Sequence, residues 1–203
     1  MMTTRANAII CAVRNHGETG TIVRALTAEH GLIAGYVRGG RSRVMRPILV
    51  PANGVDATWA YRGGAQLASL TGELIHSRAP LMTEPLAAAA LDWVTALSAA
   101  TLPEAHPYPA LYMALDGVLT AIEAAPAARG WAAALARYEQ LLLVTLGYGE
   151  GQMATPMPSG WDEVLPLLAA NGSRIQRHLL GQRRVDVMAA RERLIDRLKR
   201  AVA

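Results

Sequence analysis

Residues 13–47 read VRNHGETGTIVRALTAEHGLIAGYVRGGRSRVMRP, and this stretch decides the expected fold. It holds three short apolar runs, separated by the turns His16-Gly17, His30-Gly31 and Gly39-Gly40. Short apolar runs between glycine turns predict a β-meander. The last turn carries four basic residues and no acidic one, namely Arg38, Arg41, Arg43 and Arg46. We therefore predict a flexible basic loop whose shape suits a phosphate backbone.

The strand pattern continues on both sides of this stretch. Every second residue from Val55 to Tyr61 is apolar, and a period of two is typical of a half-buried strand. About five strands at short spacing with glycine turns, over residues 5–77, predict a small barrel or sandwich. The expected strands cover residues 7–14, 21–27, 32–38, 48–50 together with 55–62, and 66–76.

The sequence changes character at Arg78-Ala79-Pro80, after which it predicts helices. We expect two domains: residues 1–78 form the barrel and residues 79–203 form a helical domain, so the fold class is α+β. The expected helices cover residues 83–100, 109–124, 128–146 and 161–170, and a last one starts at Asp186.

Helix boundaries and one unusual arginine give more specific expectations. Thr83 is expected to cap the first helix, and Asn171-Gly172 to end the helix that starts at residue 161. Ser173 and Gln176 have the spacing of a capping box for the segment that follows. Arg191 falls inside the apolar stripe of the last helix, so we expect it to pair with an acidic residue or to reach the surface.

The composition excludes several protein classes. The chain has 203 residues, 52% hydrophobic and 18% charged, which is enough for one large domain or two small ones with a real core. No apolar run reaches the roughly 18–20 residues of a membrane-spanning helix, and the N-terminus does not resemble a signal peptide. The single cysteine, Cys11, excludes an internal disulfide and a cysteine-cluster zinc site, and it is expected in the core. We predict a cytoplasmic protein.

Charge is distributed unevenly along the chain. Residues 1–78 hold nine arginines and four acidic residues, a net charge of +5. Residues 79–173 hold two arginines and nine acidic residues, a net charge of −7. Residues 174–203 hold nine basic and three acidic residues, a net charge of +6. The C-terminal arginines either extend a DNA-binding groove or keep the last helix soluble, and we favour the second interpretation. They are Arg183-Arg184 and the face of Arg193, Arg197 and Arg200.

No motif for catalysis or cofactor binding stands out. The segment Gly17–Gly20 lacks the Lys-Ser/Thr of a phosphate-binding loop, and the glycines at 147–151 follow a helix instead of a strand. The five histidines show no metal-ligand spacing. We predict that the protein is not an enzyme and uses no cofactor.

The basic residues are the sequence feature that points to a function. Arg14, Arg24 and Arg62 are expected to line the barrel face beside the basic loop, so that counterion release favours binding of DNA. Tyr36, Trp59 and Tyr61 have rings that can stack on bases, although core packing is the favoured interpretation for Trp59. The alternative for the loop arginines is a solvated loop without a partner.

Two motifs together resemble the RecO family of recombination-mediator DNA repair proteins. The first runs from Val13-Arg14 through His16-Gly17-Glu18-Thr19 and residues 22–31 to residues 36–43. The second is the stretch LARYEQLLLVTLGYG at residues 135–149, which is similar to the end of a family helix. The resemblance covers nearly the whole chain and is weakest after Gly151.

The resemblance implies an N-terminal OB-fold, a C-terminal helical domain and several partners. It implies binding of single- and double-stranded DNA, action with RecR, and contact with the acidic C-terminal tail of single-strand DNA-binding protein. The family arginine for that tail contact matches Arg137, and the alternative for Arg137 is an internal pair, for instance with Glu139. Some family members hold zinc through four cysteines after this motif; this chain has none there, so we predict no zinc site.

The function that the resemblance implies is that of a recombination mediator. It anneals complementary strands and helps load RecA onto coated DNA, in the cytoplasm and associated with the nucleoid. Two alternatives remain. A preference for structured RNA would favour an RNA-binding accessory protein of translation. Nuclease activity lost on one carboxylate substitution would favour a hydrolase with dispersed acidic residues.

Overall fold

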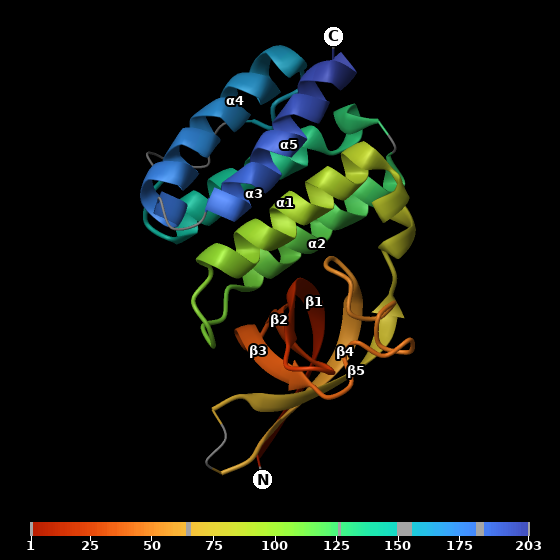
Figure 1. Cartoon of the computed structure of the whole chain (residues 1–203). Helices are drawn as coiled ribbons and strands as arrows, with labels where there is room; N and C mark the ends of the chain where they lie inside the picture. Colours follow the sequence, from red (N-terminus) through yellow and green to blue (C-terminus); the bar gives the residue numbers. More distant parts are fainter. Residues whose placement is uncertain (1, 64–65, 126, 150–155, 182–184, 203) are drawn as a thin grey trace. The chain divides into compact units, whose positions relative to one another are not determined.

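The computed structural model describes residues 2–63, 66–125, 127–149, 156–181 and 185–202 (Figure 1). Its chain divides into two compact units. The barrel unit comprises Met1–Glu84 and Thr95–Tyr112, and the helical unit comprises Pro85–Val94 and Met113–Ala203. Helices α1 (Pro85–Thr101) and α2 (Pro109–Ala124) each contribute residues to both units. The predicted domain boundary between residues 78 and 79 stays a prediction.

Five strands close into a barrel in the order β1-β2-β3-β5-β4 (Figure 1). Neighbouring strands are antiparallel, except that β3 and β5 run parallel. A closed five-stranded barrel with this order is the architecture of the OB-fold. The predicted fold class is therefore confirmed. The strands are β1 (Met2–His16), β2 (Gly20–Thr27), β3 (Gly31–Val37), β4 (Gly54–Tyr61) and β5 (Ala68–His76).

Alternating apolar side chains fill the barrel. Trp59 of β4 is fully buried there, packed with Ile10, Val23 and Leu70 among others. The core interpretation of Trp59 is thus confirmed. Cys11 is also buried, as predicted, and burial raises the pKa of its thiol to about 12. The thiol therefore stays protonated at neutral pH.

Residues 48–50, predicted as a strand, form a hydrogen-bonded turn instead. The amides of Ile48 and Leu49 both donate to the carbonyl of Met45, at 3.1 and 2.9 Å. The side chains of Met45, Ile48 and Leu49 pack against the barrel core. The strand prediction was wrong because apolar residues here cover the core from a turn instead of pairing in the sheet.

The helical unit is built around buried aromatic residues. Three of them are fully buried: Trp93 of α1, Tyr138 of α3, and Trp131, which directly precedes α3. The remaining elements, beside α1 and α2, are the 3-10 helices η1 (Ala79–Thr83) and η2 (Ala128–Gly130), α3 (Ala132–Thr145), α4 (Trp161–Arg174), the π-helix η3 (Ile175–Leu180) and α5 (Val185–Val202). None of the described helices is long and apolar enough to cross a membrane.

Three predicted helix boundaries were wrong. Glu84, and not Thr83, is the N-cap of α1, because the Thr83 hydroxyl donates to the Pro80 carbonyl. Helix α4 continues through Asn171-Gly172 and passes into η3. The predicted capping box is absent because Ser173 lies inside α4, where its hydroxyl donates to the carbonyl of Ala169. Tertiary contacts of Asn171 and Gly172, described below, explain why the helix does not stop.

Candidate nucleic-acid interface

Three strands of the barrel present a continuous outer row. Arg14 of β1 is paired with Ile22 of β2, and Ile22 is paired with Tyr36 of β3. Directly opposed residues point to the same side of a sheet. Their strand neighbours Val13, Val23 and Val37 pack in or against the core, so the row faces outward.

An aromatic pair extends this row toward the end of β1. The rings of His16 and Tyr36 meet edge to face, with centroids 6.1 Å apart and planes at 83°. The Tyr36 ring lies across Gly20, where an added Cβ would fall 2.2 Å from the tyrosine oxygen. Glycine at position 20 therefore lets the ring lie close to the sheet. Such a ring on an OB-fold surface suits stacking against a base.

The basic loop, residues 38–50, is tied at its first half to the turn between β1 and β2. The Arg41 amide donates to the Thr19 carbonyl at 3.3 Å, and its guanidinium donates to the Glu18 carbonyl at 2.7 Å. The Arg46 guanidinium donates in turn to the Arg41 carbonyl at 3.0 Å. The loop is a series of hydrogen-bonded turns, and its predicted flexibility stays a prediction.

The four loop arginines are all exposed, while Met45, Ile48 and Leu49 of the loop pack against the barrel core. Ser42 accepts a hydrogen bond from the Met45 amide at 3.2 Å and so caps the turn that carries Arg43 and Arg46. Gly40 packs against Thr21 of β2, with room for no side chain. A fixed array of exposed cations suits a polyanion because little ordering is needed on binding.

Two of the predicted DNA-binding residues lie apart from this array. The guanidinium of Arg24 donates to the Ala99 carbonyl and forms an ion pair with Glu104 at 3.1 Å. Arg62 is exposed just beyond β4, where Tyr61 pairs with Met2, at the opposite end of β1 from Arg14. The structure thus brings together Arg14 and the loop residues Arg38, Arg41, Arg43 and Arg46.

The helical unit carries a cavity near Arg137, the residue predicted to contact an acidic tail. Arg137 is half-buried on α3, and its guanidinium donates to Gln140 at 2.9 Å. The cavity has a volume of about 370 Å³ and is bounded by Ala133, Arg129 and Trp161, among others. Ala133 lies one helical turn before Arg137, on the same face of α3. The cavity therefore offers one arginine, one aspartate (Asp162) and the Trp161 ring, close to Arg137 along α3.

Known proteins agree with this architecture. The N-terminal model of recombination protein O matches residues 1–78, and the C-terminal model of the same protein matches residues 82–149. The DNA repair protein RecO of Rhodospirillum centenum is 34% identical to the chain, over 96% of this chain and 94% of its own length. The RecO of Jannaschia sp. is also 34% identical, over 98% and 97%.

The chain belongs to the RecO family of DNA repair proteins. The alignment to the Rhodospirillum RecO extends over 239 positions, so at least 36 of them have no counterpart in this 203-residue RecO-family chain. Among its described residues, no group of three or more His, Cys, Asp or Glu could hold a metal ion.

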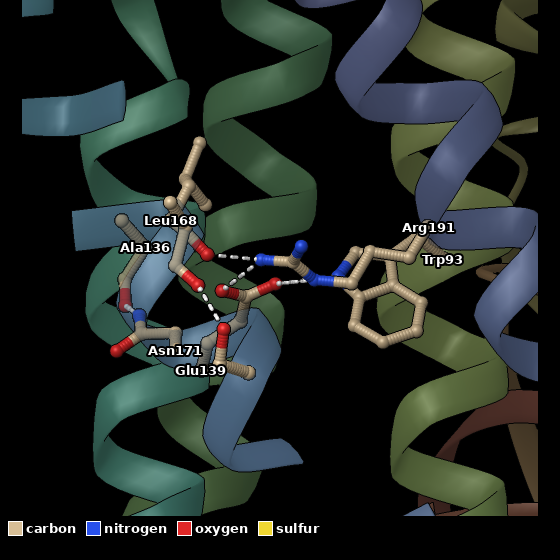
Figure 2. A network of polar contacts seen from close by, with 8 residues as sticks. Trp93, Ala136, Glu139, Leu168, Asn171 and Arg191 are labelled. Carbon is tan, nitrogen blue, oxygen red and sulfur yellow. Dashed lines mark hydrogen bonds and ion pairs between the residues drawn. The ribbon is translucent and has the colours of Figure 1, made fainter. Parts of the chain in front are cut away.

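A buried polar network in this RecO-family chain was only partly predicted (Figure 2). Arg191 of α5 forms a bidentate ion pair with Glu139 of α3, at 3.2 and 3.1 Å, and donates to the Leu168 carbonyl of α4. The Trp93 indole donates to Glu139 at 2.8 Å. The prediction that Arg191 pairs with an acidic residue is confirmed. The internal pair suggested as the alternative for Arg137 stays a hypothesis; the Arg137 guanidinium donates to Gln140 within α3.

Burial and hydrogen-bonding partners act in opposite directions on the pKa of Glu139. Burial raises the pKa of the Glu139 carboxyl, while Arg191, Trp93 and Asn171 oppose the shift. The Arg191 guanidinium also lies over the Trp93 ring, 5.5 Å from its centroid. This network joins α1, α3, α4 and α5 within the helical unit.

Sequence reasoning missed two residues near the basic loop and the outer row. His16 was assigned to a turn, and nothing in the local sequence shows that its ring meets Tyr36 of β3, two strands away in the barrel. Asn53 was passed over, although the motif Asn53-Gly54 marks a turn. A buried asparagine there signals hydrogen bonds to nearby backbone groups.

Proposed function

We propose that this RecO-family protein binds single- and double-stranded DNA, anneals complementary strands and helps load RecA onto DNA coated with single-strand DNA-binding protein. The observation that supports the proposal most is the set of four exposed arginines on a hydrogen-bonded loop, beside Arg14 and Tyr36 on the outer barrel face. RecR is a proposed partner on the strength of the family alone.

The mechanism requires no bond to be made or broken. Arginines on the basic loop neutralise phosphates of a strand and release counterions. Tyr36 and its neighbour His16 offer a ring surface to a base. Neutralising two strands lowers their mutual repulsion, so complementary sequences can meet. We leave Arg24 out of the proposed contact set because Glu104 and the Ala99 carbonyl already engage it.

The helical unit is the proposed docking site for the acidic tail of single-strand DNA-binding protein. Arg129 and Trp161 line the cavity together with Asp162, and Arg137 adds positive charge one helical turn beyond Ala133 of its lining. Arginines bind the carboxylates of an acidic peptide, and the Trp161 ring offers an apolar contact to the end of that peptide. Docking there brings annealing activity to coated DNA.

The proposal is tested by a double substitution that spares the hydrogen bonds of the loop. Arg38→Ala with Arg43→Ala removes two exposed charges, while Arg41 and Arg46 keep their contacts to the backbone. We expect weaker binding to single-stranded DNA and a slope of log affinity against log salt that is smaller by about 1.4, or about 0.7 per phosphate. Annealing of bare complementary strands should fall in parallel.

The matched control is Arg197→Ala with Arg200→Ala, which removes two exposed charges from α5. This variant should keep the wild-type slope, because we assign the C-terminal arginines to solubility. Equal losses in the two double variants would contradict the assignment to the loop. Tighter binding of structured RNA than of single-stranded DNA by the wild type would contradict the DNA proposal and favour the RNA-binding alternative.

A further inference from the structure

Asn53 lies at the entrance to β4 and uses its whole side-chain amide for contacts inside the protein. It is fully buried. Its amide nitrogen donates to the carbonyls of Pro47 and Ile48, at 3.0 and 3.1 Å. Its amide oxygen accepts a hydrogen bond from the Arg78 backbone at 2.8 Å. One side chain therefore joins the end of the basic loop to the segment that leaves the barrel.

The backbone around Asn53 is fixed to the barrel independently. The Asn53 carbonyl accepts from the Ile10 amide of β1 at 3.0 Å, and the Ile10 carbonyl accepts from the Ala52 amide at 2.8 Å. The Arg78 guanidinium donates to the Ala52 carbonyl at 2.9 Å. Asn53 is thus a rigid point from which the loop end can be held.

The basic loop has two separate attachments, one at each end. Its first attachment is made by Arg41 to the turn between β1 and β2. Its second is the pair of hydrogen bonds from Asn53 to Pro47 and Ile48. Arg43 and Arg46 lie between the two attachments, so their positions depend on both.

We propose that Asn53 is a positioning residue for DNA binding, which holds the end of the basic loop so that its arginines form one array. The inference rests on the proposed function. Asn53 is buried and does not meet DNA itself. Without its amide, the Pro47 carbonyl loses this donor and the Ile48 carbonyl keeps only the Val50 amide. The end of the loop is then held by its apolar side chains and by the backbone hydrogen bond from the Asn53 amide to the Val50 carbonyl. DNA must then order the loop, and that ordering reduces affinity.

The test measures affinity for single-stranded DNA over a salt series with Asn53→Ala. We expect binding weaker by on the order of tenfold and a smaller salt slope, because fewer arginines contact phosphates together. The amides of Ile48 and Leu49 should exchange hydrogen faster, while the amides of strands β1 and β2 keep their protection.

Asn171→Ala is the matched control. Asn171 is likewise buried, and its side chain donates to a backbone carbonyl, that of Ala136 at 2.8 Å in the helical unit. We expect it to lose a similar amount of stability and to keep the wild-type salt slope. A loss of slope in Asn171→Ala as large as in Asn53→Ala would show a general effect of destabilisation and overturn the inference.

If Asn53→Ala does not fold, Asn53→Ser is the variant to test. Its hydroxyl keeps one acceptor for the Arg78 amide and one donor. Its salt slope should lie below that of the wild type, and an unchanged slope and affinity in a folded Asn53 variant would overturn the inference. A different result would contradict the proposed function itself: the double variant Arg38→Ala with Arg43→Ala would bind DNA as tightly as the wild type. If that double variant is weakened and the Asn53 variants are not, only the inference about Asn53 fails.

Discussion

Arg191 and Arg193 are two residues apart on α5, and their surroundings give them different roles. Arg191 is buried in a bidentate pair with Glu139, whereas Arg193 pairs with Asp92 at 2.8 Å and both of these side chains are more than half exposed. An exposed pair is screened by water and contributes little. Breaking a buried pair is costly because it leaves an isolated charge.

At the residue scale, we predict that Arg191→Leu destabilises the protein by about 3–5 kcal/mol at neutral pH. Burial already raises the pKa of Glu139, and losing Arg191 removes the main opposing effect, so this pKa rises further. Between the ordinary glutamate pKa and the raised one, the folded state binds more protons than the unfolded state. Stability of the variant therefore falls as pH rises through that range.

Urea unfolding at about pH 5 and about pH 8 checks this prediction. The loss caused by Arg191→Leu should be smaller at the lower pH. Arg193→Leu is the control and should cost less than about 1 kcal/mol at either pH. An equal loss for Arg191→Leu at both pH values would show that the charge of Glu139 does not cause it.

At the element scale, α4 shows how packing overrides a local helix-stop signal. Asn171 sends its side chain to the Ala136 carbonyl of α3, and Gly172 lies against the Arg191 guanidinium. An added Cβ at Gly172 would fall 2.2 Å from a guanidinium nitrogen that its ion pair keeps in place. Glycine is therefore needed for space here, and not to end the helix.

We predict opposite effects for two helical Gly→Ala substitutions. Gly172→Ala should destabilise by about 1–3 kcal/mol because it displaces the Arg191 guanidinium from Glu139. Gly117→Ala, in the exposed face of α2 with nothing within 4 Å, should stabilise by about 0.5–1 kcal/mol through helix propensity. Thermal or urea unfolding checks both values, and a stabilising Gly172→Ala would contradict the packing argument.

At the scale of the whole molecule, two functions are assigned to two units. The basic loop belongs to the barrel unit, and Arg137 belongs to the helical unit. Residues 1–78 carry a net charge of +5, whereas residues 79–173 carry −7 and residues 174–203 carry +6. Annealing and docking should therefore be separable by substitution.

We predict that Arg137→Ala anneals bare complementary strands at the wild-type rate but fails on strands coated with single-strand DNA-binding protein, because docking is lost. Arg38→Ala with Arg43→Ala should be impaired on both substrates, because the strands themselves are held less well. Annealing rates on bare and coated strands check the difference. The assignment of Arg137 is wrong if Arg137→Ala anneals coated strands normally.

The sequence alone determined the elements that depend on local periodicity. The alternation from Val55 to Tyr61, the glycine turns at Gly17 and Gly31, and the apolar stripe around Arg191 placed strands, turns and a buried cation where the structure has them. Side-chain period and turn chemistry act over a few residues, so they can be read without knowing the rest of the chain.

Only the tertiary structure decided which distant groups meet. Arg24 binds Glu104, Glu139 binds Arg191, and Asn53 binds Pro47 and Ile48, and none of these pairings follows from spacing. Residues 48–50 lie in a turn from which Ile48 and Leu49 cover the barrel core. Burial makes an unpaired polar group costly, so each such group takes a partner that the closed fold brings within reach, whatever its distance along the sequence.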